Sequence, residues 1–169
     1  AAASIVWMII EWIRFGKPSL VGIVTGMVAG LATVTPASGD IGVPGGLILG
    51  ISGGIFCYLA VDLIRGKLKI DDSLDVFAVH GVGGILGTIL VAFLATDSFS
   101  GAGLSDEKTV SSQLYSQVFG VFLTVVWTAI LTYLILKITS MFTNLRVDEE
   151  EEIEGLDLRS HGERAYSKD

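Results

Sequence analysis

The stretch DVFAVHGVGGILGTILVAFLA, residues 75–95, decides the fold class of this chain. After Asp75 its only ionisable side chain is His80, and several glycines follow that histidine at close intervals. An apolar run of about 20 residues is long enough to cross a bilayer as one helix. A lone ionisable residue inside such a helix usually faces a cavity or pathway, and the alternative is a histidine hydrogen-bonded across a helix contact. His80 is therefore the first candidate functional residue.

Composition places the rest of the chain in the same class. Of 169 residues, 51% are hydrophobic and 21 are glycine, which is typical of membrane helices that pack closely. Residues 147–169 contain nine acidic and three basic side chains, whereas residues 1–146 contain nine and eight. We therefore predict a nearly neutral membrane domain over 1–146 and an acidic soluble tail over 147–169. Cys57 stands alone, which excludes an internal disulfide and a multi-cysteine metal site. We expect no metal, cofactor or nucleic-acid partner.

Five apolar segments predict an all-α, polytopic membrane protein. The predicted helices cover residues 1–15, 19–37, 41–64, 74–95 and 113–143. The first reaches Arg14 after thirteen residues, fewer than the roughly 20 that a spanning helix needs, so we expect it to be the truncated end of a longer helix. The last is longer than a ~30 Å hydrocarbon core requires, so we expect it to tilt or to protrude.

Basic residues orient these helices. Seven of them follow segments that end on one side if the helices alternate in direction: Arg14, Lys17, Arg65, Lys67, Lys69, Lys137 and Arg146. The connections on the other side contain only Lys108. Because basic loops remain in the cytoplasm, this asymmetry predicts a multi-pass protein of the cell membrane with a cytoplasmic C-terminus.

Glycine spacing and charged pairs predict local contacts. Glycines recur every four residues at positions 22, 26 and 30, at 42, 46, 50 and 54, and at 83 and 87. That spacing places them on one helix face and lets neighbouring backbones approach closely. A separation of three residues predicts local ion pairs between Glu11 and Arg14 and between Asp62 and Arg65.

Three aspartates precede the helix that contains His80, namely Asp71, Asp72 and Asp75. Asp72 or Ser73 is placed to cap this helix, and acidic side chains there suit its dipole. Capping accounts for one or two of the aspartates and leaves the third unexplained. In α-helical geometry, Asp75 and His80 would lie roughly 100–140° apart around the helix axis.

Three motifs together resemble a known family. They are GLATVTPASGDIGVPGGLILG (residues 30–50), DSLDVFAVHGVGGILGT (72–88) and LRVDEEEEIEGLDLRSHGERAY (145–166). These stretches resemble the ammonium transporter family (Amt/Mep/Rh), and the tail is most similar to the Amt branch. The resemblance implies an eleven-helix subunit with two inverted five-helix halves and a long final helix, assembled as a homotrimer with one pore per subunit. The chain would then be the C-terminal half of one subunit, followed by its cytoplasmic tail.

The same resemblance implies transport of ammonium or ammonia through an apolar pore that contains a pair of histidines. His80 resembles the second histidine of that pair, and the first would belong to the other half of the subunit. Six further positions resemble pore-lining residues: Thr25, Val28, Thr35, Asp72, Asp75 and Val76. The tail resembles a regulatory segment that couples neighbouring pores, at Gly155, Leu156, Asp157, His161, Gly162, Glu163 and Tyr166. A PII signalling protein is an expected partner at this cytoplasmic face.

Other function classes fit the residues less well or remain open. An ammonium sensor would share the pore motifs, and half of a transporter could be functionally inert by itself. The sequence ASGD at 37–40 faintly resembles an intramembrane aspartyl protease. That chemistry needs two facing aspartates inside the membrane, whereas Asp40 is predicted to lie in an exposed turn, so we expect no enzymatic activity. By composition alone the acidic tail would be disordered, whereas the resemblance favours an ordered regulatory segment.

Overall fold

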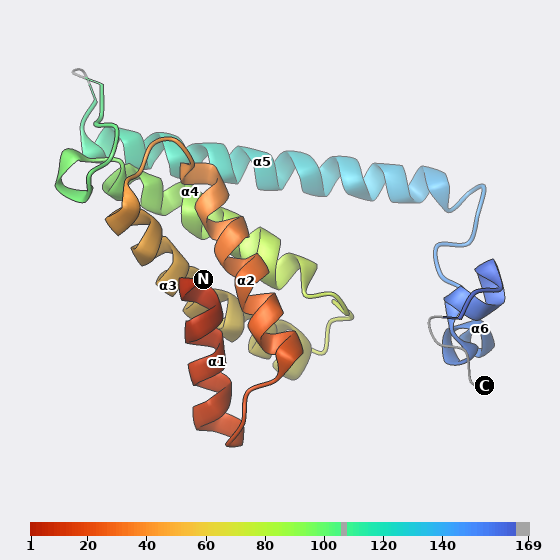
Figure 1. The fold of residues 1–169 in the computed structure, drawn as a ribbon. Coiled ribbons are helices and arrows are strands. Elements are labelled where there is room, and N and C mark those ends of the chain that lie inside the picture. The colour runs from red at the N-terminus through yellow and green to blue at the C-terminus, as the bar shows by residue number, and fades with distance from the viewer. Residues whose placement is uncertain (106–107, 165–169) are drawn as a thin grey trace. The chain divides into compact units, whose positions relative to one another are not determined.

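The computed structural model describes residues 1–105 and 108–164, and within these residues the regular structure is entirely helical (Figure 1). The principal helices are α1 (Ala2–Phe15), α2 (Leu20–Val34), α3 (Val43–Val61), α4 (Val82–Leu94), α5 (Val110–Thr139) and α6 (Glu149–Glu154). Four helical stretches are long and apolar enough to span a membrane: Leu20–Ala37, Val43–Lys67, Phe77–Leu94 and Val110–Thr139. The predicted all-α, polytopic membrane fold is confirmed.

Short segments of other helical geometry extend three of these helices. A 3₁₀ turn, η1 (Thr35–Ala37), follows α2, and a π-helical segment, η2 (Asp62–Lys67), continues α3. A second π-helical segment, η3 (Phe77–Gly81), precedes α4. Their presence explains why the apolar segments predicted from the sequence are longer than the α-helices themselves.

The last long helix begins three residues earlier than predicted. Its start is fixed by Thr109 and Ser112, because the backbone N–H of Thr109 donates to Ser112 Oγ at 3.0 Å and that of Ser112 donates to Thr109 Oγ1 at 3.2 Å. Such reciprocal bonding satisfies donors that the first helical turn leaves free. Polar residues before the apolar run therefore belong to the helix, and the apolar pattern alone missed them.

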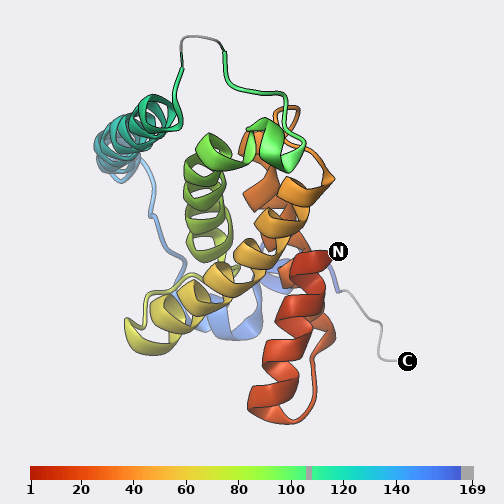
Figure 2. The same cartoon turned by 90° about the vertical axis from the view of Figure 1, so that its left-hand side faces the viewer.

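Residues 1–122 form a bundle in which α2 and α3 each pack against both α1 and α4 (Figure 2). Glycines make the approach of α1 possible. A Cβ atom added at Gly26 would lie 2.7 Å from Trp7 Cβ, and one added at Gly54 would lie 3.0 Å from the carbonyl oxygen of Ala3. The prediction of close packing at these glycines is therefore confirmed. Among the described residues Gly46 has no such contact, since an added Cβ there would meet none of their atoms within 4 Å.

A fully buried threonine joins the three central helices. Thr33 on α2 donates from Oγ1 to the carbonyl oxygen of Ala29 at 2.7 Å. Gly53 of α3 and Gly83 of α4 face its side chain, and a Cβ added at Gly83 would lie 2.9 Å from Thr33 Oγ1. A Cβ added at Gly87 would overlap the Thr33 carbonyl oxygen. The sequence did not single out Thr33, since neither its spacing nor its type distinguishes it from other helical threonines.

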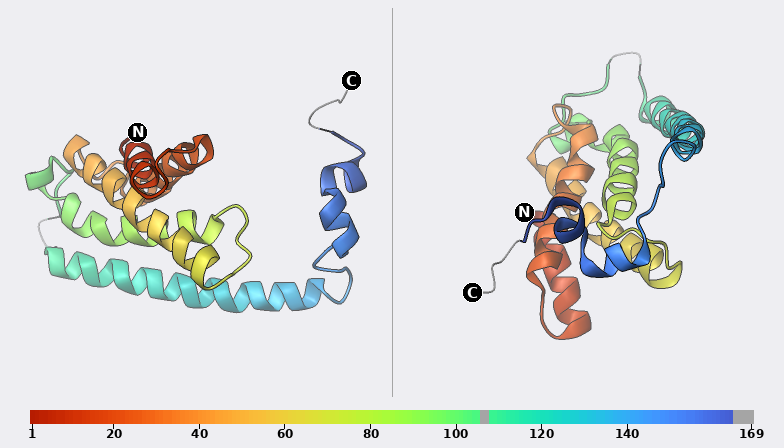
Figure 3. Two further views of the ribbon diagram at one scale, coloured as in Figure 1. Left: turned by 90° about the horizontal axis from the view of Figure 1, so that it is seen from below. Right: turned by 90° about the vertical axis from the view of Figure 1, so that its right-hand side faces the viewer.

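The two ends of the bundle differ in the number of basic residues that they contain. One end, called here the basic end, holds Arg14, Arg65 and Asp75, and includes the turn between α3 and η3. At the opposite end the N–H of Ala102 donates to the carbonyl oxygen of Asp40 at 2.9 Å, which ties the loop after α4 to the loop before α3. Figure 3 shows these two connections at opposite ends of the bundle. The ends of α1 and α3, predicted to share a side, therefore do so.

Residues 123–164 comprise the rest of α5, α6 and a short π-helical turn, η5 (Asp157–His161). Surface ion pairs support this segment. Arg146 contacts Glu152 at 2.9 Å, and Arg159 contacts Glu154 at 3.3 Å. The tail therefore contains local helical order despite its acidic composition. A boundary between a membrane domain and a tail at residues 146 and 147 stays a prediction.

Candidate functional site

Asp72 fixes the start of the helix that contains His80. Its Oδ1 accepts the backbone N–H of Val76 at 2.8 Å, and its Oδ2 accepts those of Phe77 at 3.0 Å and Ala78 at 3.3 Å. A carboxylate at a helix N-terminus satisfies free donors and complements the helix dipole. The predicted capping role of Asp72 is confirmed.

Asp75 is held by both its backbone and its side chain. Its φ angle of 54° lies in the left-handed region, which aspartate tolerates better than most residues. Its carbonyl oxygen accepts the N–H of Val79 at 2.8 Å, and its carboxylate pairs with Arg65 at 3.2 Å. Asp75 is therefore explained by an ion pair to the preceding helical segment and not by capping.

His80 lies in the π-helical segment η3. The N–H of Val82 donates to the carbonyl oxygen of Phe77, five residues earlier, so this turn is wider than an α-helical turn. Ala78 and Val79 are buried against the bundle, whereas His80 is exposed within the described chain. The angle expected between Asp75 and His80 assumed α-helical geometry and does not apply, because each residue of a wider turn advances less around the axis.

A cavity of about 280 Å³ opens at the basic end of the bundle. Its lining combines the aromatic rings of Trp7 and Tyr58 with Thr25 and the charged residues Glu11, Asp62, Arg65 and Asp75. Two of the predicted pore-lining residues, Thr25 and Asp75, thus share one cavity. Five do not line it, namely Val28, Thr35, Asp72, Val76 and His80.

The local ion pairs predicted around this cavity are wrong. Arg14 contacts Asp62 at 3.4 Å and donates to the Tyr58 hydroxyl at 3.2 Å, so it bridges α1 to the end of α3. Glu11 instead accepts the N–H of Ser19 at 2.7 Å. Residues three apart are neighbours on an isolated helix, but in a tight bundle the adjacent helix offers partners that are equally near.

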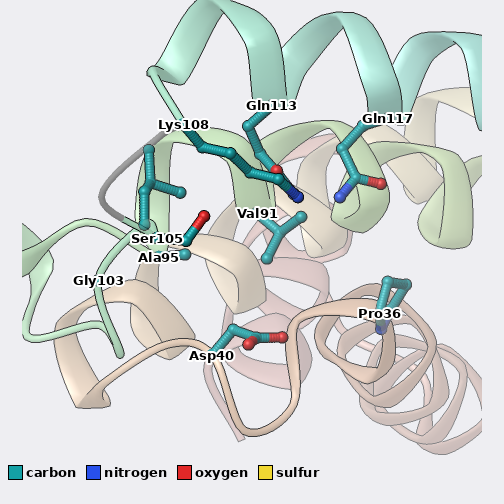
Figure 4. A pocket seen from close by; sticks show the side chains of 10 residues that line it. Pro36, Asp40, Val91, Ala95, Gly103, Ser105, Lys108, Gln113 and Gln117 are labelled. Atoms are coloured by element: carbon teal, nitrogen blue, oxygen red, sulfur yellow. The ribbon is translucent and has the colours of Figure 1, made fainter.

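A second cavity, of about 260 Å³, lies at the opposite end of the bundle. Figure 4 shows Lys108, Gln113 and Gln117 converging over Val91, with Asp40 on the other side of the space. Asp40 is exposed, as its predicted turn position requires. Gln113 Oε1 is buried without a hydrogen-bond partner among the described residues. The sequence did not indicate this cavity, because its lining comes from three distant segments.

Comparison with known proteins assigns the family. The sequence model of the Ammonium Transporter Family matches residues 1–166. The chain belongs to the ammonium transporter family. Family membership confirms the resemblance that the three motifs carry.

Two curated relatives show how much of a family protein is present. Ammonium transporter Amt1 of Archaeoglobus fulgidus is 44% identical over 168 residues, which cover 99% of this chain and 42% of that protein. The ammonium transporter of Bacillus subtilis is 42% identical, covering 98% of this chain and 42% of the relative. The chain therefore spans about two fifths of the length of the family members it matches.

Solved family structures agree with the helical arrangement. A structure titled Sensor Amt Protein superposes with a TM-score of 0.82 at 30% identity, covering 94% of this chain and 38% of that one. Saccharomyces cerevisiae Mep2 superposes with a TM-score of 0.75 at 32% identity, covering 89% of this chain and 35% of that one. The order of the helices described above is therefore an ammonium transporter arrangement.

The tail residues singled out within this family lie around two turns. Gly155 has a φ of 97° and ends α6, and Gly162 has a φ of 66° and ends η5. The N–H of Glu163 donates to the carbonyl oxygen of Asp157 at 3.0 Å, which closes the second turn. Leu156 and His161 are exposed, and Tyr166 lies outside the described residues. Glycine suits both turns, because left-handed backbone costs other residues free energy.

Proposed function

We propose that the chain forms the C-terminal half of a subunit that conducts ammonium or ammonia across the cell membrane. One observation carries the proposal: His80 is the lone ionisable residue between Val76 and Ala95, and the bundle leaves it exposed. An ionisable side chain in a membrane-spanning helix rarely faces lipid, so we expect His80 to face a path or cavity. The family of the chain supports the choice of substrate.

Physical chemistry explains how such a path selects ammonium. Ammonium and potassium are similar in size, so a sieve alone separates them poorly. An apolar lumen makes an unaccompanied charge costly, whereas neutral ammonia crosses with little loss of solvation. Ammonium can release a proton and potassium cannot. A neutral imidazole offers one hydrogen-bond donor and one acceptor, so His80 can bind ammonia, and a second histidine from the other half would complete a pair.

The remaining predicted pore residues take supporting roles in this proposal. Thr25 and Asp75 would line the cytoplasmic mouth, because they share the cavity at the basic end of the bundle. Thr35, Val28, Asp72 and Val76 would lie along the path above and beside it. Thr35 donates its hydroxyl to the carbonyl oxygen of Leu31 at 2.7 Å, so its oxygen lone pairs are left to accept a hydrogen bond.

The decisive experiment replaces His80 in a full-length subunit that contains this chain. His80→Ala, reconstituted in vesicles, should lower ammonium flux or admit potassium, because the polar group along the path is lost. Thr128→Val on α5 is the matched control, since its hydroxyl bonds its own helix at 2.7 Å and is exposed. A His80→Ala variant with normal ammonium flux and normal exclusion of potassium would return His80 to a structural role.

Assembly and regulation belong to the same proposal. The subunit would form a homotrimer with its tail in the cytoplasm, where residues 155–166 couple the pores and a PII protein binds. Native mass spectrometry of the reconstituted protein measures the number of subunits. Protease access from either side of a vesicle shows on which side of the membrane the tail lies. By itself the 169-residue chain should give no ammonium flux above that of empty vesicles, because it supplies one histidine of the proposed pair and one half of the proposed path. Flux from the chain alone would contradict this arrangement.

A sensor is the second candidate function. The observation in its favour is the similarity to the structure titled Sensor Amt Protein. Both candidates predict ammonium binding, but only a transporter predicts flux. A full-length protein whose thermal unfolding shifts with ammonium while vesicles show no uptake would favour the sensor.

A further inference from the structure

We propose that Arg65 is a positioning residue for the helix that carries His80, an inference that rests on the proposed role of His80 in transport. Its guanidinium binds the carboxylate of Asp75 and so fixes the residue at which that helix begins. The spacing of charges pairs Arg65 with Asp62, three residues away, whereas the partner in the structure lies ten residues away across a turn.

The contact between the two side chains is close and largely covers the carboxylate. Arg65 Nη1 lies 3.2 Å from Asp75 Oδ1 and 3.4 Å from Oδ2. The Asp75 side chain is 14% exposed, whereas that of Arg65 is 49% exposed. A carboxylate that is mostly covered by protein depends on its partner more than a fully solvated one does. The pair therefore differs from exposed pairs, which contribute little.

The backbone around Asp75 shows what the pair holds in place. Asp75 has left-handed backbone geometry and receives the first hydrogen bond of the helix, from the N–H of Val79. Asp72 accepts the three N–H groups that precede that of Val79 in sequence, those of Val76, Phe77 and Ala78. Two side chains thus determine the entry of η3. Asp72 supplies hydrogen-bond acceptors from within the turn, and Arg65 ties the same turn to α3.

Both partners of the pair lie in or beside π-helical segments. Arg65 belongs to η2, and Asp75 lies two residues before the start of η3 and five residues before His80. Wide turns of this kind are rare and are often found at functional sites. Without Arg65, the turn can relax toward α-helical spacing, which would rotate His80 about the helix axis. Arg65 would therefore act on transport through the direction in which His80 faces.

Three variants of the full-length subunit test this role. Asp75→Asn removes the negative charge while keeping a side chain that tolerates left-handed backbone. Arg65→Ala removes the guanidinium group, and Arg65→Lys keeps the positive charge without the planar guanidinium. Lys67→Ala is the matched control, because Lys67 is an exposed base in the same segment. The readouts are the ratio of ammonium to potassium flux, the concentration of half-maximal flux, and the nitrogen-15 spectrum of labelled His80.

We expect Arg65→Ala and Asp75→Asn each to lower the flux ratio about fivefold, and the double variant to be no worse than either, as coupled residues behave. Arg65→Lys should recover part of the loss, and Lys67→Ala should leave the ratio unchanged. The His80 resonances should move in the same variants. If Arg65→Ala does not assemble, Arg65→Lys and Asp75→Asn still report on the pair.

Two results would overturn the inference while leaving the proposed function intact. One is wild-type transport with an unchanged flux ratio in both Arg65→Ala and Asp75→Asn. The other is an equal loss in Lys67→Ala, which would show a general effect of positive charge. A wild-type protein that transports no ammonium would instead overturn the proposed function itself.

Discussion

Two regions of the molecule are similarly apolar but differ in how far their glycines approach other helices of the described chain. In the span Phe77–Leu94, 39% of the residues are buried, whereas in Val110–Thr139 none is buried. The difference follows glycine content, since α4 brings Gly83 and Gly87 against Thr33, while the one glycine of α5, Gly120, meets nothing within 4 Å. Because lipid is as apolar as a leucine side chain, helices in membranes associate where small residues permit close approach. Hydrophobicity therefore indicates which segments are able to span a membrane, and glycine indicates where neighbouring backbones approach closely.

The largest difference between the two helices is expected from a pair of glycine substitutions. Gly87→Leu should destabilise the protein by about 3 kcal/mol, because any Cβ at this position overlaps the Thr33 carbonyl oxygen and the backbones must separate. Gly120→Leu should change stability by less than ~0.5 kcal/mol. Thermal unfolding of the two variants in detergent measures both effects. Equal losses would show that close packing does not distinguish the two helices.

A smaller effect is expected where glycine serves a turn instead of a helix contact. Gly155→Ala should cost about 1–2 kcal/mol locally, because the backbone there has a φ of 97°. If the tail couples pores, ammonium flux should fall while the homotrimer stays intact, and Asp157→Ala should act in the same way. Vesicle uptake and native mass spectrometry provide the two readouts, with Ser160→Ala as the exposed control. Unchanged flux in both variants would favour a tail without a regulatory role.

The loss of a single hydroxyl group should also affect a buried and an exposed threonine differently. Thr33→Val should cost about 1 kcal/mol, because the bond to Ala29 is lost and a methyl group is pressed against Gly53. Thr128→Val on α5 loses a similar bond at an exposed site, so its effect should be below ~0.5 kcal/mol. Chemical unfolding of both variants decides whether burial makes the difference. A larger effect at Thr128 would contradict it.

The smallest effects are expected among the ion pairs of the tail. Arg146 and Glu152 are 67% and 50% exposed, so their coupling energy should be less than about 0.5 kcal/mol and should decrease with salt. A double-mutant cycle with Arg146→Ala and Glu152→Ala measures it. The same cycle for Arg65 and Asp75 should give a larger value, since that carboxylate is mostly covered. Similar values would remove the distinction between bundle and tail.

Much of the candidate site follows from local rules. The apolar run around His80 predicts a spanning helix, and the aspartate four residues before Val76 predicts its cap, because both depend on groups within a few residues of each other. The partners of Arg14 and Arg65 could not be predicted in the same way. Both arginines bind carboxylates on other segments, and the choice depends on which helix faces meet.

The sequence alone determined that this protein is an all-α membrane protein of the ammonium transporter family, with a lone histidine in an apolar span and glycines where helices approach. Composition, periodicity and motifs are properties of short stretches of sequence, so they can be recognised without knowing the tertiary structure. Only the tertiary structure decided that Thr33 joins three helices, that η3 is π-helical, and that Arg65 reaches Asp75. These features depend on distances between segments remote in sequence, which are set by packing of whole helix faces and not by any one residue.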